Sequence, residues 1–367
     1  MNSVYSSRRE RLLAHLAENG PGKALVTNPL NLCYLTGNRI APYERLYALV
    51  LDGANTSCSF LLPSLHYSLP LDSSIEKISY NDEDDPAALL SEMISSSDRL
   101  GVEFDAFSFA LSNKFMSHNS ALRFEDIGTL LSKYRMLKTG EEIEALQTAA
   151  AYSDEVCAAI AAEVKPGISE KAILARIFSL IAKLDGTHND PYVIQVLNGP
   201  NTANPHGDAG DRLLQKGEPL SIDFGVCYAH YWSDCTRTFF AGKPAPQFET
   251  IYNVVLEAQE AAISKIKPGV QIKEIDSAAR QVIEKAGYGE YFIHRTGHGI
   301  GLNIHEEPKI HSRNDDPLLE GMVFTVEPGI YIPGLGGVRI EDDIAIVANK
   351  AKVLNKYPKR YDKMVLL

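Results

Sequence analysis

The sequence predicts two domains: a smaller α/β domain at the N-terminus, then an α+β domain built from two duplicated halves. Short apolar runs alternate with turn residues in the first third, a long helix begins near residue 132, and a helix–turn–helix segment occurs twice after it. A chain of 367 residues has room for roughly two domains at about 150 residues each. We therefore expect one domain over residues 1–131 and a second over residues 132–367.

The first third carries signals for both strands and helices. The segments "ALVT" (24–27), "LCYLTG" (32–37), "YALVLDG" (47–53) and "CSFLLPSL" (58–65) predict strands, and "DPAALLSEMISS" (85–96) predicts a helix. The opening "MNSVYSSRRERLLAHLAENG" predicts an amphipathic helix rather than a signal peptide, because no uninterrupted apolar stretch follows its arginines. Together these segments predict an interleaved α/β domain.

The second domain begins with a capped helix and contains an internal repeat. Thr139 and Glu142 have capping-box spacing, so a long helix is predicted after them. The turn at residues 165–167 has the sequence Lys-Pro-Gly, which recurs at residues 267–269, and both copies lie between helical segments and are followed by strands. Two copies are too few for a solenoid. We interpret them as two facing half-domains, the alternative being a chance likeness between helical hairpins.

Composition excludes several classes of protein. Hydrophobic residues make up 45% of the chain and charged residues 23%, as in an ordinary globular domain. The net charge of −11 argues against a nucleic-acid partner. The sequence contains no run of 18 apolar residues, so it predicts no membrane span. The five cysteines form no C-x-x-C pair, which indicates reduced thiols and a cytoplasmic location.

Two acids face each other in a predicted hairpin of the first half. The segment "EPLSIDFGVCYAHYWSDCTRTFFAG" predicts strands at 220–226 and 232–240. Asp223 and Asp234 lie equally far from a turn centred between Tyr228 and Ala229, so the hairpin would place them opposite each other, with Cβ atoms about 5 Å apart. Like charges in such a pair are destabilising unless a cation lies between them.

The second half repeats the arrangement. In "MVFTVEPGIYIPGLGGVRIEDDIAIV" the midpoint is Gly334, so Glu327 and Glu341 can also face each other. Strand alternation places Arg339, Glu341 and Asp343 on one face and Asp342 on the other.

These acids predict a metal site. One pair could be a solvated surface feature, but two pairs inside apolar strands must be protonated, paired or bound to metal. His298 lies in "HRTGHGIGLNIHEEP", a predicted strand where Gly297 and Gly299 let the backbone approach closely, with His294 and His305 lining the adjoining cleft. Four carboxylates and one histidine suit two divalent cations, with manganese favoured and cobalt or zinc able to substitute.

Competing motifs are weaker. The segment "GHGIGLN" has the wrong spacing for a dinucleotide-binding loop and no predicted helix after it. Cys235 adjoins Asp234 but points to the other strand face, so we assign it to the core. The sequence has no P-loop, no G-x-S-x-G elbow and no zinc-like cysteine cluster.

The motifs "SIDFG", "YWSDCTRTF", "HRTGHGIGLNIHEEP", "VFTVEPGIY" and "GVRIEDD" resemble the signature blocks of the pita-bread dinuclear metallopeptidases. Within that family they resemble the Xaa-Pro branch, prolidase and aminopeptidase P. "NPLNLCYLTG" and "RMLKTGEEIEAL" resemble the same branch, including its creatinase-like N-terminal domain, so the resemblance covers nearly the whole chain. It implies a pita-bread catalytic domain after that N-terminal domain.

The resemblance also implies roles for individual residues. Asp223 and Asp234 would bind one metal, Asp234 and Glu341 would bridge, and His298 and Glu327 would complete the second site. Further residues would contact substrate or take part in catalysis: His206, His294, His305 and Arg339, with Glu327 as proton carrier. The alternatives are a water-bonded loop histidine for His206 and, for Arg339, an ion pair with Glu341 or Asp343.

The implied activity is hydrolysis of Xaa-Pro bonds by a hydroxide held between two divalent cations. A dipeptidase (prolidase) is favoured over an aminopeptidase P acting on longer peptides. A non-peptidase hydrolase or lyase on the same scaffold remains open, whereas the intact ligand set argues against a metal-free creatinase-type enzyme or a binding protein. Family members are commonly homodimers, so the resemblance implies a homodimer.

Overall fold

The computed structural model describes residues 4–94, 98–188 and 194–366. The chain divides into two compact units, Met1–Arg135 and Met136–Leu367. The boundary expected at residue 131 falls inside helix α5 (Gly128–Met136), shortly before this division. The predicted helices over residues 1–20 and 85–96 begin or end in residues 1–3 and 95–96, which lie outside the described ranges.

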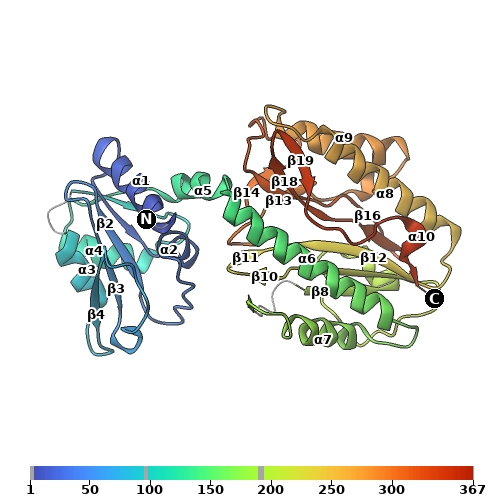
Figure 1. The fold of residues 1–367 in the computed structure, drawn as a ribbon, viewed down its shortest axis with the longest axis horizontal. Helices are drawn as coiled ribbons and strands as arrows, with labels where there is room; N and C mark the ends of the chain where they lie inside the picture. The colour runs from blue at the N-terminus through green and yellow to red at the C-terminus, as the bar shows by residue number, and fades with distance from the viewer. Residues whose placement is uncertain (1–3, 95–97, 189–193, 367) are drawn as a thin grey trace. The chain divides into compact units, whose positions relative to one another are not determined.

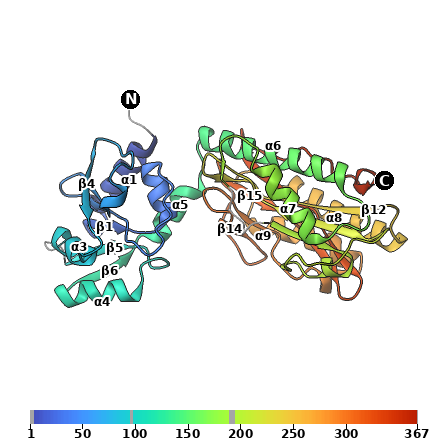
Figure 2. The ribbon, with the colours of Figure 1, turned by 90° about the horizontal axis from the view of Figure 1, so that it is seen from below.

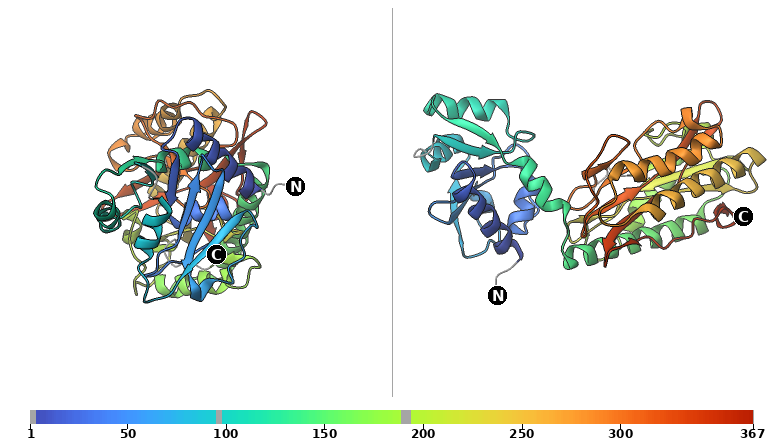
Figure 3. Two further views of the ribbon diagram at one scale, coloured as in Figure 1. Left: turned by 90° about the vertical axis from the view of Figure 1, so that its left-hand side faces the viewer. Right: turned by 90° about the horizontal axis from the view of Figure 1, so that it is seen from above.

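The first unit is built around a six-stranded mixed sheet in the order β4-β3-β2-β1-β5-β6 (Figure 1; Figure 3, left). The pairs β1–β2 and β2–β3 are antiparallel, and the pairs β3–β4, β1–β5 and β5–β6 are parallel. Its elements before α5 are α1 (Val4–Glu18), β1 (Lys23–Val26), α2 (Pro29–Thr36), β2 (Ala48–Asp52), β3 (Ser57–Pro63), η1 (Ser64–His66), β4 (Ile75–Tyr80), α3 (Pro86–Ile94), β5 (Arg99–Val102), α4 (Phe109–His118) and β6 (Arg123–Asp126).

One strand prediction in this unit is wrong. Residues 32–36 of this segment form most of helix α2, although strands are found at the other three predicted segments. The side chain of Asn28 accepts a hydrogen bond from the Leu30 N–H, Pro29 occupies the first turn, and Gly37 ends the helix with φ 77°. These are the signals of a capped helix, and a short apolar run by itself does not distinguish a helix from a strand.

The second unit contains two long helix pairs and two main sheets. The sheets have the orders β20-β12-β9-β8 and β14-β13-β15-β18-β19. Its elements are α6 (Gly140–Glu163), α7 (Glu170–Ile181), β7 (Thr187–His188), β8 (Ile194–Asn198), η3 (Gly199–Ala203), β9 (Pro219–Phe224), β10 (Cys227–Tyr228), β11 (Tyr231–Trp232), β12 (Cys235–Ala241), α8 (Pro246–Lys265), α9 (Ile272–Lys285), η4 (Gly289–Tyr291), β13 (Gly297–Gly299), β14 (Glu306–Ile310), β15 (Val323–Val326), β16 (Gly329–Ile332), β17 (Gly336–Arg339), β18 (Asp342–Val347), β19 (Lys350–Val353), α10 (Tyr361–Met364) and β20 (Val365–Leu366).

The capping box that opens α6 is formed as predicted. The Thr139 hydroxyl accepts a hydrogen bond from the Glu142 N–H, and the Glu142 carboxylate accepts one from the Thr139 N–H. Two of the donors that a helix N-terminus leaves unsatisfied are thereby paired.

The two helix pairs share backbone geometry as well as sequence. Gly167 and Gly269 both have positive φ, 93° and 84°, and each donates its N–H over 2.8 Å, to the carbonyl of Leu214 and of Leu318 respectively. Within the sheets, β8 pairs with β9 as β13 pairs with β15, and β12 follows β9 as β18 follows β15. This correspondence supports the predicted duplication.

The strands of the second unit lie between α7 on one side and the pair α8–α9 on the other (Figures 1 and 2; Figure 3, right). One hydrophobic cluster joins these layers and includes Ile177 of α7, Phe239 of β12, Val255 of α8 and Phe324 of β15. Cys235 belongs to this cluster, as predicted. Among the described residues, no helix combines the length and the apolar character needed to cross a membrane.

Candidate metal centre

The first acidic hairpin forms, but its register differs from the prediction. Asp223 pairs with Thr236 rather than with Asp234. The turn is centred one residue later than expected, at Ala229 and His230, which have φ values of 47° and 75°. Such a two-residue turn with two positive φ values matches the twist of antiparallel strands. Because the register shifts by two residues, Asp234 becomes a diagonal neighbour of Asp223 and stays on the same face.

The second acidic hairpin has the predicted register. Val326 pairs with Asp342 in one sheet and Gly329 with Arg339 in the next. Glu327 and Glu341 hold the intervening positions, where the chain passes from one pair of strands to the other. The expected centre of the hairpin, Gly334, lies in the turn with φ 78°.

His298 occupies a strand that only glycines could flank. It is the central residue of β13, and a Cβ on Gly297 would overlap the carbonyl oxygen of Thr325. A Cβ on Gly299 would overlap the carbonyl oxygen of Glu307. The predicted role of these glycines, close approach of the backbone, is therefore confirmed.

Acids from both hairpins meet at this histidine. Ligand atoms of Asp234, His298 and Glu341 all lie within 4.8 Å of one another. The His298 Nε2 atom is 3.6 Å from Asp234 Oδ2 and 3.3 Å from Glu327 Oε1. Asp234 Oδ1 and Glu341 Oε1 are buried and accept no hydrogen bond from any residue described. Buried carboxylate oxygens without donors are costly, so this donor set fits divalent cations.

Burial determines how these groups titrate. It raises the pKa of Asp234 and of Glu341 well above the usual range, and neighbouring carboxylates raise both further. Burial also raises the pKa of Glu327 to about 7. His298 moves in the opposite direction, because burial lowers its pKa to about 3. Without a cation, these surroundings favour a neutral His298 imidazole and protonated acids. A bound cation would instead favour the ionised form of the acids.

Asp223 is joined to the centre through Arg339. The Arg339 guanidinium forms an ion pair with Asp223, where Glu341 or Asp343 was the expected alternative partner. The same guanidinium donates to the Thr236 hydroxyl at 3.0 Å and to the Tyr331 hydroxyl at 2.8 Å. Its nearest acid is thus the one on the opposite hairpin, because the register of β9 and β12 brings Asp223 beside Thr236.

The three other histidines lie at different depths. The His294 ring is partly buried, with Nε2 2.9 Å from the Tyr331 hydroxyl, and burial lowers its pKa to about 4. The exposed His305 stacks edge-on against His298, with ring centroids 4.2 Å apart. His206 is also exposed, in the segment after η3. Burial lowers the pKa of His305, and a charge on His206 would lower it further, as it would the pKa of His294. His206 therefore lies within electrostatic reach of both His294 and His305.

Family comparisons agree with this geometry. Metallopeptidase family M24 matches residues 144–348, and the creatinase/prolidase N-terminal domain matches residues 8–137. The chain belongs to metallopeptidase family M24. This assignment confirms the predicted pita-bread fold, the creatinase-like N-terminal domain and the metallopeptidase class.

Characterised relatives match this M24 chain over nearly its whole length. It is 36% identical to a Xaa-Pro dipeptidase of Pyrococcus furiosus over 352 residues, which cover 95% of this chain and 97% of that protein. Its structure is similar to that of a prolidase from Thermococcus sibiricus, with a TM-score of 0.92, 34% identity and 100% of both chains covered. It is also similar to an X-Pro aminopeptidase from Thermotoga maritima, with a TM-score of 0.83, 30% identity and coverage of 96% and 99%.

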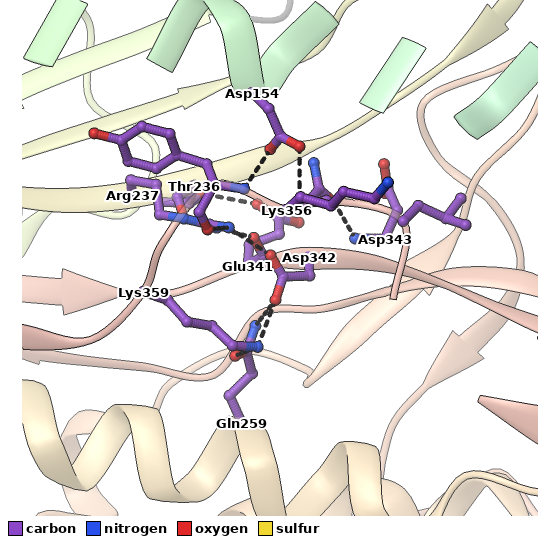
Figure 4. A network of polar contacts seen from close by, with 12 residues as sticks. Asp154, Thr236, Arg237, Gln259, Glu341, Asp342, Asp343, Lys356 and Lys359 are labelled. Atoms are coloured by element: carbon purple, nitrogen blue, oxygen red, sulfur yellow. Dashed lines mark hydrogen bonds and ion pairs between the residues drawn. The ribbon is translucent and has the colours of Figure 1, made fainter. Parts of the chain in front are cut away.

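A buried ionic network supports the M24 centre from the opposite strand face (Figure 4). Arg237 of β12 is fully buried and donates to the Glu341 carbonyl at 2.5 Å and to the Asp342 carboxylate at 2.6 Å. The Asp342 carboxylate also accepts from Lys359 at 2.7 Å and from Gln259 at 3.1 Å. Asp342 therefore points away from Glu341, as alternation predicted, and this network fixes the backbone that carries Glu341.

Sequence reasoning missed several polar residues of this M24 site. Tyr331 links His294 to Arg339, and Thr236 donates to Glu341 Oε2 at 2.6 Å. Both follow from strand alternation, since Thr236 lies two residues after Asp234 and Tyr331 lies four after Glu327. Arg237 carried no comparable signal, because Glu341 and Asp342, which it contacts beside the centre, are more than 100 residues away in sequence.

Proposed function

We propose that this M24 enzyme is a metal-dependent Xaa-Pro dipeptidase. The observation that carries the proposal is the meeting of His298 with carboxylates from both hairpins, where Asp234 Oδ1 and Glu341 Oε1 are buried and accept no hydrogen bond from any described residue. Hydrolysis of a tertiary amide before proline needs an activated water and a polarised carbonyl. Two divalent cations would supply the activated water and the polarised carbonyl. Carboxylate and imidazole donors of this kind suit such cations.

We assign five ligands to two divalent cations. Asp223 and Asp234 would hold one cation, His298 and Glu327 the other, and Asp234 and Glu341 would contact both. Two doubly charged cations would balance the four carboxylates and lower the pKa of Asp234 and Glu341, which burial now raises. Manganese is favoured because oxygen donors dominate, although cobalt or zinc could substitute.

The reaction chemistry is divided between the cations and the protein. When bound, the two cations would activate a shared water and polarise the substrate carbonyl. Glu327 would carry the proton from the water to the leaving nitrogen. His305, exposed beside His298, would donate a hydrogen bond to the oxyanion. Neutral His298 is suited to ligation because burial disfavours its protonated form.

The remaining residues would orient the peptide. We propose that His206, His294 and Arg339 bind the substrate or the residues that contact it. Support comes from the chain of contacts that joins His294 through the Tyr331 hydroxyl to Arg339 and on to Asp223. This chain would fix the orientation of Arg339 beside the acids before substrate arrives.

The choice between dipeptidase and aminopeptidase is tested by peptide length. The dipeptidase is favoured because the Pyrococcus and Thermococcus proteins of similar length carry that activity in their names. Ala-Pro and Ala-Pro-Ala should be assayed with added Mn²⁺ and with chelator. The expected result is metal-dependent cleavage of Ala-Pro with kcat/KM at least tenfold higher than for Ala-Pro-Ala. A preference for the tripeptide supports the aminopeptidase, and no cleavage of either refutes both.

Two further properties are proposed on the family resemblance. We propose a homodimer, which analytical ultracentrifugation of the full chain would test by giving twice the 40.4 kDa chain mass. We also propose a cytoplasmic location, consistent with five buried cysteines. Fractionation of the native cells would check it.

A further inference from the structure

A buried carboxylate outside the metal centre holds the segment that carries His206. Glu170, the first residue of α7, is fully buried. Its Oε1 atom accepts hydrogen bonds from the Asn198 N–H at 2.7 Å and from the Asn201 side-chain amide at 3.0 Å. Its Oε2 atom accepts one from the Gly210 N–H at 2.7 Å. One side chain therefore ties together both ends of residues 198–210, defined here as the His206 loop.

The duplicated half shows that the fold itself does not require this carboxylate. The N–H groups of Glu170 and Lys171 donate to the carbonyls of Arg212 and Gly210, at 3.3 Å and 3.1 Å. In the second half, Ile272 and Lys273 make the same connections, to Asp316 and Asn314 at 3.0 Å and 2.8 Å. Ile272 thus occupies the position of Glu170 with an apolar side chain, and the backbone connection forms nonetheless.

The His206 loop reaches the metal centre through two contacts. The Arg339 guanidinium, which pairs with Asp223, donates to the Pro205 carbonyl at 3.4 Å. The Thr202 hydroxyl accepts a hydrogen bond at 2.7 Å from the N–H of Gly337, which lies in β17, the strand that also carries Arg339. The conformation of the loop therefore determines what Arg339 and His206 face.

Burial gives the Glu170 carboxylate a defined geometry. It also lies near the Arg212 guanidinium, whose pKa is raised mainly by Glu218 and to a lesser extent by Glu170. That guanidinium packs against Gly199, where an added Cβ would lie 2.6 Å from Arg212 Nη2. The start of the loop is thus held by the buried Glu170 carboxyl group and by Arg212, both of which would resist loop movement when a peptide binds.

We propose that Glu170 is a positioning residue that holds the His206 loop in the substrate-binding arrangement. The proposal rests on the proposed peptidase function for its kinetic test, but the loop arrangement has a separate readout. The substitution Glu170→Gln keeps the shape of the side chain while placing an amide nitrogen against at least one N–H donor. At least one of the three bonds must then be lost.

A double-mutant cycle separates positioning from general structural support. With the Mn²⁺-loaded full chain and Ala-Pro, E170Q and His206→Ala should each lower kcat/KM at least tenfold. If Glu170 acts through the loop, E170Q should cost no more than about twofold in the H206A background. Independent, multiplying effects in the double variant would overturn the proposal. The matched control is Glu163→Gln, an exposed glutamate paired with Arg176 of α7, which should change kcat/KM less than twofold.

Hydrogen exchange provides the readout that does not depend on activity. The amide of Asn198 or of Gly210, whichever faces the new side-chain NH₂ group, should exchange at least tenfold faster in E170Q than in E163Q, with Mn²⁺ affinity unchanged by calorimetry. Unchanged exchange would overturn the proposal, and so would a loss of Mn²⁺ affinity in E170Q as large as the change in exchange. Both outcomes can be read even if the wild-type protein cleaves no Xaa-Pro peptide. If E170Q does not fold, Asn201→Ala removes one of the three bonds from an exposed side chain and should show the same non-additivity with a smaller loss.

Discussion

The two halves of the M24 domain share their backbone but support their histidine loops with different side chains. In the first half, Glu170 ties the loop after β8 to α7. In the second half the loop after β13, which carries His305, is held by the ion pair between Lys138 and Glu306, 3.5 Å apart with both side chains at most 2% exposed. Duplication therefore supplied the strands and turns, and the charged supports differ between the two copies.

The halves also differ in what they bring to the candidate metal centre. Of the proposed ligands, the first half carries Asp223 and Asp234 on one hairpin, whereas the second carries His298 on a glycine-bordered strand as well as Glu327 and Glu341. Strand β8, which corresponds to β13, reads IQVLN and contains no glycine. Both strands lie within the described residues, and only β13 has a backbone that approaches its neighbours closely enough to require glycine.

The largest effect should come from removing one donor from either half. If both halves hold the same cations, Asp234→Ala and His298→Ala should each abolish Mn²⁺ binding and lower kcat/KM by at least about 10³-fold, because charge stabilisation of several kcal/mol is lost. Metal content by mass spectrometry and Ala-Pro turnover measure this. Asp315→Ala, on an exposed loop of the second half, should leave both unchanged. Retained turnover in either ligand variant would contradict a shared centre.

The next effect concerns the ion pair that joins the halves. Arg237 of β12 and Asp342 of β18 are fully buried, so Arg237→Met should lower the free energy of unfolding by about 3–5 kcal/mol. Arg176→Met breaks a pair within the first half that is exposed to solvent and should cost less than about 1 kcal/mol. Urea unfolding of the two variants gives the comparison. Equal losses would mean that the junction is no more important than a surface pair.

A smaller effect on stability is expected from substituting Gly297, the glycine that precedes His298 in β13. Gly297→Ala places a methyl group on the Thr325 carbonyl, so we expect a loss of about 1–3 kcal/mol and reduced Mn²⁺ affinity. Gly140→Ala, at the open first turn of α6, meets no atom within 4 Å and should be neutral or slightly stabilising. Thermal unfolding would detect the difference. A neutral G297A variant would show that β13 can move away from β15.

The smallest effect is a pH dependence of the metal-free protein. The pKa of Glu327 is raised from 4.5 to about 7, so its stability contribution is lost as the pH rises through 7. The pKa of His298 is lowered from 6.5 to about 3, so its contribution is lost as the pH falls below 6.5. Above pH 6.5 the acids dominate the dependence, and Glu327 alone should cost about 0.8 kcal/mol between pH 6.5 and 8.

Unfolding in EDTA at pH 6.5 and 8 would measure this loss. Glu327→Gln should reduce the slope, and saturating Mn²⁺ should remove it because bound cations favour the ionised acids. Stability that rises with pH in the chelated wild-type protein would contradict the sign.

The two hairpins show how far local sequence patterns determine a register. In the second, the Pro/Gly-rich loop is centred on Gly334 and the predicted pairing of Glu327 with Glu341 follows from counting. In the first, counting misplaced the turn by one residue because Ala229 and His230 adopt positive φ, which neither residue type signals. The face of Asp234 was still predicted correctly, since side chains alternate with a period of two.

Contacts between distant segments were harder to predict. The partner of Arg339 is Asp223, 116 residues away, and no local pattern distinguishes it from the acids beside Arg339. Glu170 resembled any acid in the first turn of a helix, because its three donors follow 28 to 40 residues later. In α2, a cap signal at Asn28 and Pro29 was present in the sequence and was outweighed by the apolar run after it.

The distribution of ligands over the two halves has a thermodynamic consequence. Because the proposed ligands Asp223 and Asp234 precede α8 while His298, Glu327 and Glu341 follow it, a chain cut between β12 and α8 would leave each fragment with only part of the proposed donor set. Cation binding and association of the fragments would then be thermodynamically linked. If cation binding raised the affinity of the fragments for each other tenfold, the coupling free energy would be about 1.4 kcal/mol. Reassembly of such fragments would then depend on the concentration of the free divalent cation.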